Sequence, residues 1–207
     1  MVMTDLLPSV EMALAAMSLW EVLAVVLGIV YLLLAVKENI LCWHAAFLQT
    51  AISIYVFWDV QLLMESALQV YYLGMAVYGW RQWKYGSRNN GGLPVSRWNL
   101  NTHLQVIAAV LLVSGASGYL LDNHSEAAWP YLDSFTTWAS VLTTWMVARK
   151  ILENWIYWLV IDAASIFLYL ERGLYLYSLL FVVYLVIVVF GFLQWSRHYR
   201  QQALCPA

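Results

Sequence analysis

The sequence predicts an all-α integral membrane protein with seven transmembrane helices, built as two parallel three-helix repeats joined by a linker helix (3+1+3). Three observations lead to this fold class. The chain is 63% hydrophobic and only 11% charged, whereas a typical soluble domain is about half apolar and a quarter charged. Seven apolar segments alternate with mostly short polar connections. The last three segments also repeat the first three in sequence.

Each of the seven segments is close to the roughly 20 apolar residues that a spanning helix needs. They are Leu19–Val36, Ile40–Trp58, Val60–Trp80, Leu104–Leu121, Leu132–Ala148, Ile151–Leu170 and Leu174–Trp195. The long connection Arg81–His103 contains GSRNNGGLP and is predicted to be a flexible loop on the cytoplasmic side. Pro8–Ser18 is a candidate for a short interfacial helix ahead of the first span.

The repeat is visible when the chain is shifted against itself by 112 residues. Trp43 then aligns with Trp155 and Trp83 with Trp195, and 14 of the 41 positions from 43 to 83 are identical. We therefore divide the chain into a first repeat (19–80), a loop (81–103), a linker helix (104–121) and a second repeat (132–195). Parallel repeats are one of the two plans of secondary transporters, which bind substrate near the membrane midplane between the repeats.

Basic residues indicate the orientation of the chain. With seven spans, nine of the ten Lys and Arg residues fall on the side that carries the C-terminus, and Arg172 alone falls on the other side. Loops rich in Lys and Arg stay in the cytoplasm. We therefore expect the N-terminus outside the cell and the C-terminus in the cytoplasm.

The sixth span carries an unusual polar face. An ionisable group at membrane depth is costly and usually faces a cavity or a partner. The residues on this face are spaced by three or four, which places them on one side of a helix. They are Asn154, Trp158, Asp162, Ser165 and Tyr169, with Trp155 beside them.

Two other spans of the first repeat carry matching polar residues. The third span has a stripe with the same spacing, and the second span has a shorter polar patch. These residues are Gln61, Glu65, Gln69 and Tyr72 in the third span, and Gln49, Thr50 and Ser53 in the second. Polar side chains from both repeats therefore converge on one interior. Together, Trp and Asp indicate a substrate with a flat and cationic part.

Several of these residues have plainer explanations. Gln49, Gln69 and Ser53 are also explained by hydrogen bonds between helices. Glu153 is expected to form an ion pair with Arg149 or Lys150 at the inner surface. A further group is expected to anchor helices at the membrane interface. Its members are Trp80, Trp83 and Trp195.

No motif in the sequence indicates a catalytic site. The sequence contains no nucleophile–base pair, phosphate loop or metal cluster, so we expect neither catalysis nor a cofactor. Cys42 and Cys205 are far apart and form no metal or disulfide motif. No basic segment precedes the first apolar region, so no cleavable signal peptide is expected. A nucleic-acid partner is not expected either.

Three motifs resemble those of the PnuC-type bacterial vitamin transporters: WEVLAVVLGIVYLLLAVKEN, LQVYYLGMAVYGWRQW and ARKILENWIYWLVIDAAS. The resemblance covers nearly the whole chain. It implies a SWEET-like fold and uptake of nicotinamide riboside by facilitated diffusion, with trapping by a separate cytoplasmic nicotinamide riboside kinase. It also implies a homotrimer.

The resemblance gives the polar faces expected roles. Trp155 and Trp158 would stack on the pyridinium ring, and Asp162 would compensate its charge or bind the ribose hydroxyls. The amide-bearing candidates for the carboxamide and hydroxyl groups are Asn154, Gln69 and Gln49. Secondary candidates for wall or gate positions are Tyr72, Tyr184, Tyr78 and Trp80.

Other functions remain open at this point. Thiamine is also an aromatic cation, and members of this family are thought to have diverged to thiamine, riboflavin or deoxynucleosides. A proton-coupled nucleoside transporter would use Asp162 as its proton carrier. A membrane receptor or scaffold would bind without transport but would leave the internal repeat unexplained.

Overall fold

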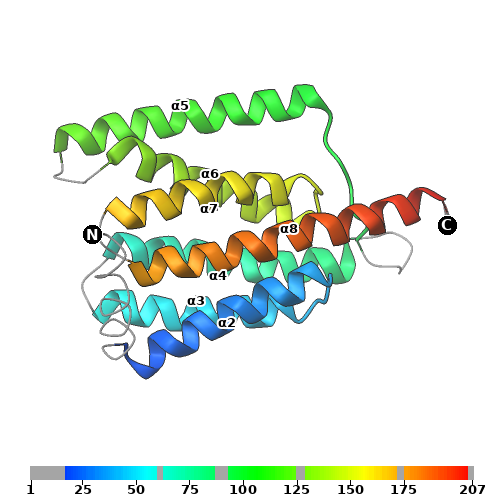
Figure 1. The fold of residues 1–207 in the computed structure, drawn as a ribbon, viewed down its shortest axis with the longest axis horizontal. Coiled ribbons are helices and arrows are strands. Elements are labelled where there is room, and N and C mark those ends of the chain that lie inside the picture. Colours follow the sequence, from blue (N-terminus) through cyan, green and yellow to red (C-terminus); the bar gives the residue numbers. More distant parts are fainter. Residues whose placement is uncertain (1–16, 60–62, 87–92, 125–128, 172–174, 205–207) are drawn as a thin grey trace, which may run out of the picture.

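The computed structural model describes residues 17–59, 63–86, 93–124, 129–171 and 175–204. These residues form seven long helices that lie side by side, which confirms the all-α prediction (Figure 1). The helices are α2 (Leu19–Val36), α3 (Cys42–Asp59), α4 (Leu63–Tyr85), α5 (Leu100–His124), α6 (Pro130–Ala148), α7 (Asn154–Glu171) and α8 (Tyr175–Leu204). The candidate helix ahead of α2 lies outside the described residues, apart from its last two positions.

The observed bounds of α2 equal the predicted span, but α4, α5 and α8 are longer than predicted. The helix α8 continues to Leu204, well beyond Trp195. The added segment SRHYRQQAL contains neither Gly nor Pro and is rich in helix formers, so the helix has no reason to stop where the apolar run ends. The prediction followed hydropathy alone and therefore missed these polar turns.

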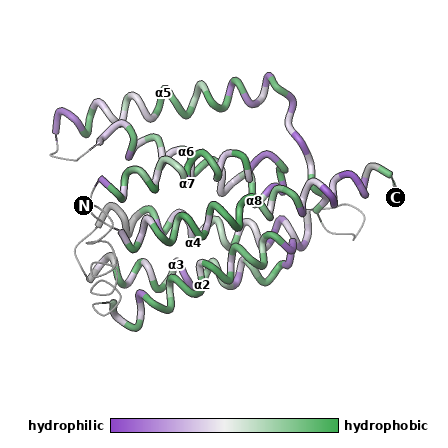
Figure 2. Tube along the Cα trace, viewed as in Figure 1, coloured by the Kyte–Doolittle hydropathy of each residue, from purple (hydrophilic) through white to green (hydrophobic). Residues whose placement is uncertain are grey.

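Three helices of the described structure are long and apolar enough to cross a membrane by themselves: Leu19–Val36, Leu100–His124 and the segment Tyr175–Gln202. Of the other four, α3, α6 and α7 carry polar side chains that are buried inside the bundle, among them Thr50, Thr143 and Asp162. Those side chains lower the apolar content of their helices. In Figure 2 the helix bodies are mainly hydrophobic, and the hydrophilic colours gather toward the helix ends.

The helices form two groups with matching neighbours. In one group α3 packs between α2 and α4, and in the other α7 packs between α6 and α8. The groups meet where α2 contacts α8 and where α4 contacts α6, while α5 packs closely only against α6 among the described helices (Figure 1). If α2 is exchanged with α6, α3 with α7 and α4 with α8, the pairs of helices that contact one another within and between the groups stay the same. This arrangement fits the predicted repeats, with α5 as the linker.

The start of α2 is determined by its sequence. The Ser18 hydroxyl accepts a hydrogen bond from the Glu21 amide at 3.3 Å, and the Glu21 carboxylate accepts one from the Ser18 amide at 2.6 Å. This reciprocal capping box satisfies two backbone donors that a helix N-terminus leaves without partners.

Two tight turns have the same construction 112 residues apart. After α2, Glu38 takes a positive φ of 51° and the Asn39 amide donates to the Leu34 carbonyl at 2.9 Å. After α6, Lys150 takes a φ of 50° and the Ile151 amide donates to the Met146 carbonyl at 3.0 Å. Such a left-handed residue with a backward hydrogen bond is a standard helix end, normally occupied by Gly.

Four tryptophans form the centre of the hydrophobic core. Trp43 meets Trp83 edge-on with a centroid distance of 5.5 Å, Trp155 meets Trp195 in the same way at 5.3 Å, and Trp83 and Trp195 lie 6.1 Å apart. All four are buried. We call these residues the four-tryptophan cluster. The expectation that Trp83 and Trp195 are interface anchors is therefore wrong, because both face the opposite half of the bundle instead of the lipid headgroups.

The cluster joins the two groups of helices by reciprocal hydrogen bonds. The Trp83 indole donates to the Val147 carbonyl at 3.2 Å, and the Trp195 indole donates to the Ala35 carbonyl at 3.0 Å. Each bond satisfies a carbonyl at the end of a helix in the other group. Donors and acceptors are again related by the shift of 112 residues.

Part of the connection predicted as a flexible loop is held in place. Residues 93–99 run beside the turn between α6 and α7, where the Ser96 amide donates to the Lys150 carbonyl at 3.0 Å and the Leu152 amide donates to the Ser96 carbonyl at 2.8 Å. Residues 81–85 belong to α4 and residues 100–103 to α5.

The same segment supplies the partner of Glu153. The Arg97 guanidinium binds the Glu153 carboxylate at 2.7 Å, and this hydrogen bond raises the pKa of the guanidinium further above its ordinary value. The Trp98 amide donates to the other carboxylate oxygen at 3.3 Å. The predicted pairing of Glu153 with Arg149 or Lys150 is wrong, because Lys150 instead pairs with Glu38.

Two glycines make room for the four-tryptophan cluster. A Cβ atom at Gly79 would lie 2.3 Å from the Trp43 ring, and one at Gly191 would lie 2.5 Å from the Trp155 ring.

We expect Gly79→Ala or Gly191→Ala to destabilise the fold by about 1–3 kcal/mol, as overpacking does in other cores. The measurement is the apparent melting temperature of the purified protein in detergent. Gly74→Ala on α4 is the matched control, because a Cβ atom there meets nothing within 4 Å. Equal melting temperatures for all three variants would contradict this account of the core.

Candidate substrate site

The polar face of α7 points into the bundle, as its spacing predicted. Asn154 is fully buried, Asp162 is 3% exposed, and Trp155 and Ser165 are buried with them. Trp158 is partly buried and packs against the hydrophobic core. None of the ion pairs among the described residues involves Asp162. A carboxylate is thus held in the interior without a salt-bridge partner in this part of the chain.

Polar residues of the first group of helices are also inside. On α3 the Gln49 amide donates to the Ser53 hydroxyl at 3.2 Å, and the buried Thr50 hydroxyl donates to the Ala46 carbonyl at 2.8 Å. Thr50 is the repeat partner of Asp162. Gln69 and Tyr72 on α4 are partly buried. The Gln49–Ser53 bond lies within α3 and does not join two helices, so the expected hydrogen bond between helices and the role of Gln49 toward substrate both stay predictions.

Three buried polar atoms close to the four-tryptophan cluster have no hydrogen-bond partner among the described residues. They are the Asn154 Oδ1 acceptor and the indole N–H donors of Trp43 and Trp155. The other end of the Asn154 amide is fixed, since its Nδ2 donates to the Ile151 carbonyl at 2.6 Å. Buried donors and acceptors in native proteins nearly always have a partner. An acceptor and two donors at this depth therefore favour a site that meets a polar ligand.

A tyrosine on α8 approaches the same interior from the other side. Asp162 is close enough to Tyr184 to act on it electrostatically. The Tyr184 hydroxyl lies so near α2 that a Cβ atom at Gly28 would be 2.8 Å from it. The ring of Tyr184 also packs on Phe181 at 5.6 Å. The secondary candidate Tyr184 thus lies at the contact between α8 and α2, within electrostatic range of the principal candidate Asp162.

Sequence reasoning missed the contribution of α2. Gly28 admits the Tyr184 hydroxyl, and the ring of Tyr31 lies 6.1 Å from that of Trp43 and interacts electrostatically with Tyr72. Neither residue belongs to a polar stripe, so the spacing gave no signal. The repeat could have identified Trp43 as a candidate site residue, because it is the repeat partner of Trp155. From the sequence it was given no role beyond the alignment of the two repeats.

The remaining two candidates are Trp80 and Tyr78. Among the described residues, the contacts given below for them do not include Asp162. The Trp80 ring packs edge-on against Tyr85 at 6.0 Å and His44 at 6.3 Å, with the Lys84 ammonium 4.8 Å from its centroid. Tyr78 is partly buried against the hydrophobic core. These surroundings resemble a membrane interface more than a binding pocket, as one of the two readings of Trp80 anticipated.

The bundle is closed at the end where α2, α4, α6 and α8 terminate. We call it the basic end; its described basic residues are Lys37, Arg81, Lys84, Arg97, Arg149, Lys150, Arg197 and Arg200. Here Lys150 binds the Glu38 carboxylate at 2.8 Å, although each side chain is only 10% exposed. His198 on α8 contacts the other oxygen of Glu38, and the Lys150 ammonium lies 4.6 Å from the centre of the Trp83 ring.

Among the described residues, no group of three or more His, Cys, Asp or Glu side chains is placed to hold a metal ion. The buried groups are instead aromatic rings, amides, hydroxyls and one carboxylate. Such a set can stack a flat ring, exchange hydrogen bonds with it and offset a positive charge.

Comparison with known proteins agrees with this fold. The profile of the nicotinamide mononucleotide transporter family matches residues 18–197. The "Nicotinamide riboside transporter PnuC" of Escherichia coli (strain K12) is 22% identical, covering 88% of this chain and 87% of that protein. The "Riboflavin/roseoflavin transporter RibM" of Streptomyces davaonensis is 23% identical over 86% of this chain and 84% of its own length.

A solved structure gives the same answer for the fold. It is titled "Crystal structure of the Vitamin B3 transporter PnuC", and it matches 95% of this chain and 90% of its own with a TM-score of 0.73 at 20% identity. The resemblance inferred from the three motifs is confirmed, and the family and these relatives are transporters, not enzymes. Since the family profile covers nearly the whole described bundle, this chain belongs to the nicotinamide mononucleotide transporter family.

Proposed function

We propose that this protein takes up nicotinamide riboside by facilitated diffusion, alternately opening its site to each side of the membrane. The observation that supports this most directly is the buried face of α7, where Asp162 lies on the same helix face as Asn154, about two turns further along the helix than Trp155. Transport by the relatives supports the class of function, and the chemistry of the face supports the substrate.

Nicotinamide riboside matches this face group by group. Its pyridinium ring is flat and positively charged, so Trp158 and Trp155 would stack on it and Asp162 would offset its charge. Its carboxamide has both a donor and an acceptor. Asn154 Oδ1 and the Trp155 indole N–H are an acceptor and a donor that lack partners among the described residues. A ligand that satisfied both would remove the cost of burying them.

Riboflavin is the second candidate, because one relative of equal similarity is described as a riboflavin transporter. Its ring system is also flat but larger and uncharged. Thiamine remains a candidate as an aromatic cation. The three vitamins therefore differ in whether Asp162 has a charge to offset and in how much space they need beside Tyr184 and Gly28.

Counterflow in proteoliposomes that contain only this protein tests the proposal. We expect accelerated exchange of labelled nicotinamide riboside without any ion gradient, because the proposed site needs no coupled ion. Unlabelled nicotinamide riboside should block the exchange, and riboflavin and thiamine should not. Exchange that requires a proton gradient would assign Asp162 to coupling, and block by riboflavin or thiamine would replace the substrate.

The role of Asp162 can be separated from its role in folding. We expect Asp162→Asn to weaken binding of nicotinamide riboside at least tenfold, about 1.4 kcal/mol, because the positive ring loses its counter-charge. Binding of reduced nicotinamide riboside, which has the same shape but no charge, should change little. Affinity is measured by calorimetry on purified protein, with Asp122→Asn at the exposed end of α5 as the control. Equal losses for both ligands would refute charge compensation.

The basic end is the proposed gate. Alternating access requires the two groups of helices to separate at each end in turn, and at this end they are held by the Trp83–Val147 and Trp195–Ala35 hydrogen bonds and by the Glu38–Lys150 ion pair. Opening the gate would break all three contacts together. Loss of one partner of a buried ion pair leaves an uncompensated charge and costs about 3–5 kcal/mol.

Cys42 is a native reporter of this gate. It is a free thiol, fully buried, and follows the turn that contains Glu38. In a Cys205→Ser background, we expect Glu38→Gln or Lys150→Gln to raise the rate at which a polar maleimide labels Cys42 at least tenfold. The double variant should label no faster than either single variant, because no charge is left unpaired. Lys37→Gln, an exposed neighbour, is the control. Unchanged labelling in both single variants would remove the ion pair from the gate.

The remaining parts of the proposal concern the setting of the transporter. The bias of basic residues supports a bacterial inner membrane protein with its N-terminus outside and the basic end in the cytoplasm. Uptake would become one-way through phosphorylation of the imported nucleoside by a cytoplasmic kinase. The family resemblance supports a homotrimer, and the internal repeat supports the division into a first repeat, a connecting segment, a linker helix and a second repeat, with the helix bounds that the structure gives.

A further inference from the structure

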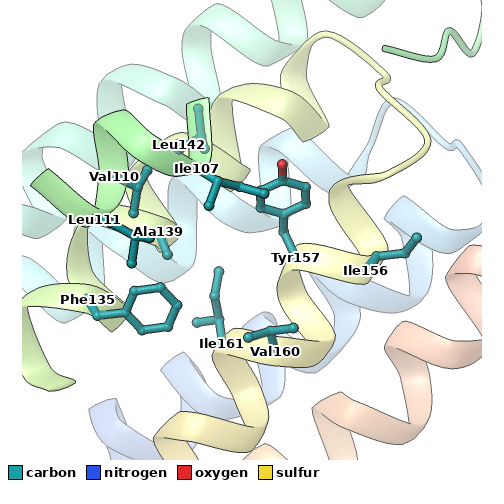
Figure 3. A pocket seen from close by; sticks show the side chains of 10 residues that line it. All are labelled: Ile107, Val110, Leu111, Phe135, Ala139, Leu142, Ile156, Tyr157, Val160 and Ile161. Carbon is teal, nitrogen blue, oxygen red and sulfur yellow. The ribbon is translucent and has the colours of Figure 1, made fainter. Parts of the chain in front are cut away.

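The linker helix α5 leaves a groove on the outside of the bundle. Among the described helices its backbone packs closely only against α6, and its His103 side chain contacts Tyr157 of α7. Between α5, α6 and α7 lies a cavity of about 230 Å³ (Figure 3). Its ten lining residues are all aliphatic or aromatic: Ile107, Val110 and Leu111 of α5, Phe135, Ala139 and Leu142 of α6, and Ile156, Tyr157, Val160 and Ile161 of α7.

This groove is separate from the candidate substrate site. Ile161 lines it, while its neighbour Asp162 belongs to the interior face of α7 described above, and none of the ten candidate site residues lines it. The one hydroxyl among these lining side chains, that of Tyr157, is already bonded to His103, so the wall suits neither a ribose nor a carboxamide. The groove therefore fits an apolar occupant.

The depth of the groove corresponds to one leaflet of a bilayer. At 1.5 Å per residue, Ile107 and Leu111 lie about 10–17 Å from the start of α5 at the basic end, and the α7 residues lie within two to three turns of its start. The hydrocarbon core of a membrane is about 30 Å thick. Leu111 and Val160 at the rim are at least half exposed, so the groove opens toward the surroundings of the bundle.

The end of the groove nearest the basic end has the residues of a headgroup site. Tyr157 Oη lies 2.9 Å from His103 Nδ1, so a polar contact closes the groove there. Beyond it, Trp98 packs between His103 and Trp145 with centroid distances of 5.5 and 6.0 Å. The exposed Arg149 guanidinium lies 5.8 Å from the centre of the Trp145 ring. Aromatic and basic residues in this combination are typical of the level of lipid headgroups.

We propose that the groove binds an acyl chain of an anionic phospholipid from the leaflet at the basic end, with its headgroup against Arg149. Two independent features support this occupant. The wall at acyl-chain depth is apolar apart from the Tyr157 hydroxyl, and the exposed Arg149 guanidinium near its mouth complements an anionic headgroup. A second copy of the chain would bring a helix surface instead, and nothing at the mouth of the groove selects for one.

Native mass spectrometry of the purified protein in detergent tests the site. After delipidation, the protein is titrated with phosphatidylglycerol and with phosphatidylcholine that carry the same acyl chains. We expect tighter binding of phosphatidylglycerol. Leu111→Trp, which fills the groove from its rim, should weaken this binding at least tenfold. Leu112→Trp should not, because the neighbouring leucine is 74% exposed and does not line the groove.

The headgroup is tested in the same titration. Arg149→Gln should remove the preference for phosphatidylglycerol over phosphatidylcholine, whereas Arg200→Gln, also exposed on the basic end, should keep it. Unchanged phosphatidylglycerol binding in Leu111→Trp would overturn the proposal. If Leu111→Trp changed the mass of the oligomer and left lipid binding unchanged, the proposal would also be overturned. The groove would then be assigned to contacts between copies of the chain.

A measurement on the unmodified protein covers the case in which a variant fails to fold. Phosphatidylglycerol with a photoreactive diazirine in its acyl chain is crosslinked to the wild-type protein, and the modified peptides are sequenced. Crosslinks at Ile107, Val110 or Val160 are expected. Crosslinks confined to other faces of the bundle would overturn the proposal.

Discussion

The structure depends on how four tryptophans meet at the basic end. The four-tryptophan cluster is too bulky to fit between ordinary helices, so Gly79 and Gly191 must lie opposite Trp43 and Trp155. Its indole N–H groups need acceptors at membrane depth, and two of them find carbonyls at the ends of α2 and α6. The glycines determine how closely helices pack within each group, and the Trp83–Trp195 contact with the two hydrogen bonds determines how the groups join.

The position of the cluster also determines what the rest of the interior can do. Because two of the four indoles have no partner for their N–H groups among the described residues, the cluster presents donors next to the Asn154 acceptor. Asp162 lies two turns further along α7, within electrostatic range of Tyr184, which contacts α2. Charge, hydrogen-bonding groups and flat rings are thus presented along one helix face instead of being assembled from mobile loops. This arrangement suits a carrier that must bind the same substrate from both sides.

Hydropathy and spacing predicted the helices and the inward face of α7, because both depend on local periodicity. The partners across the bundle were harder to predict. The local sequence around a tryptophan near a helix end is the same whether its ring contacts lipid headgroups or another helix. For this reason the prediction that Trp83 and Trp195 are interface anchors was wrong. The glycine four residues before each of them was the available signal. Glu153 found its partner in Arg97, 56 residues away, which no local pattern reports. Gly28 matters only through Tyr184, on a helix that is distant in the chain.

The turns that follow α2 and α6 have one further consequence. Glu38 and Lys150 occupy equivalent positions in the two repeats, yet they carry opposite charges and bind each other. If a transporter assembled from two identical copies of the first half, two carboxylates would face each other at this buried point, and two identical second halves would bring two ammonium groups together. Like charges at such a distance repel strongly away from water. The halves of this chain are therefore no longer interchangeable, and each has become the specific counterpart of the other.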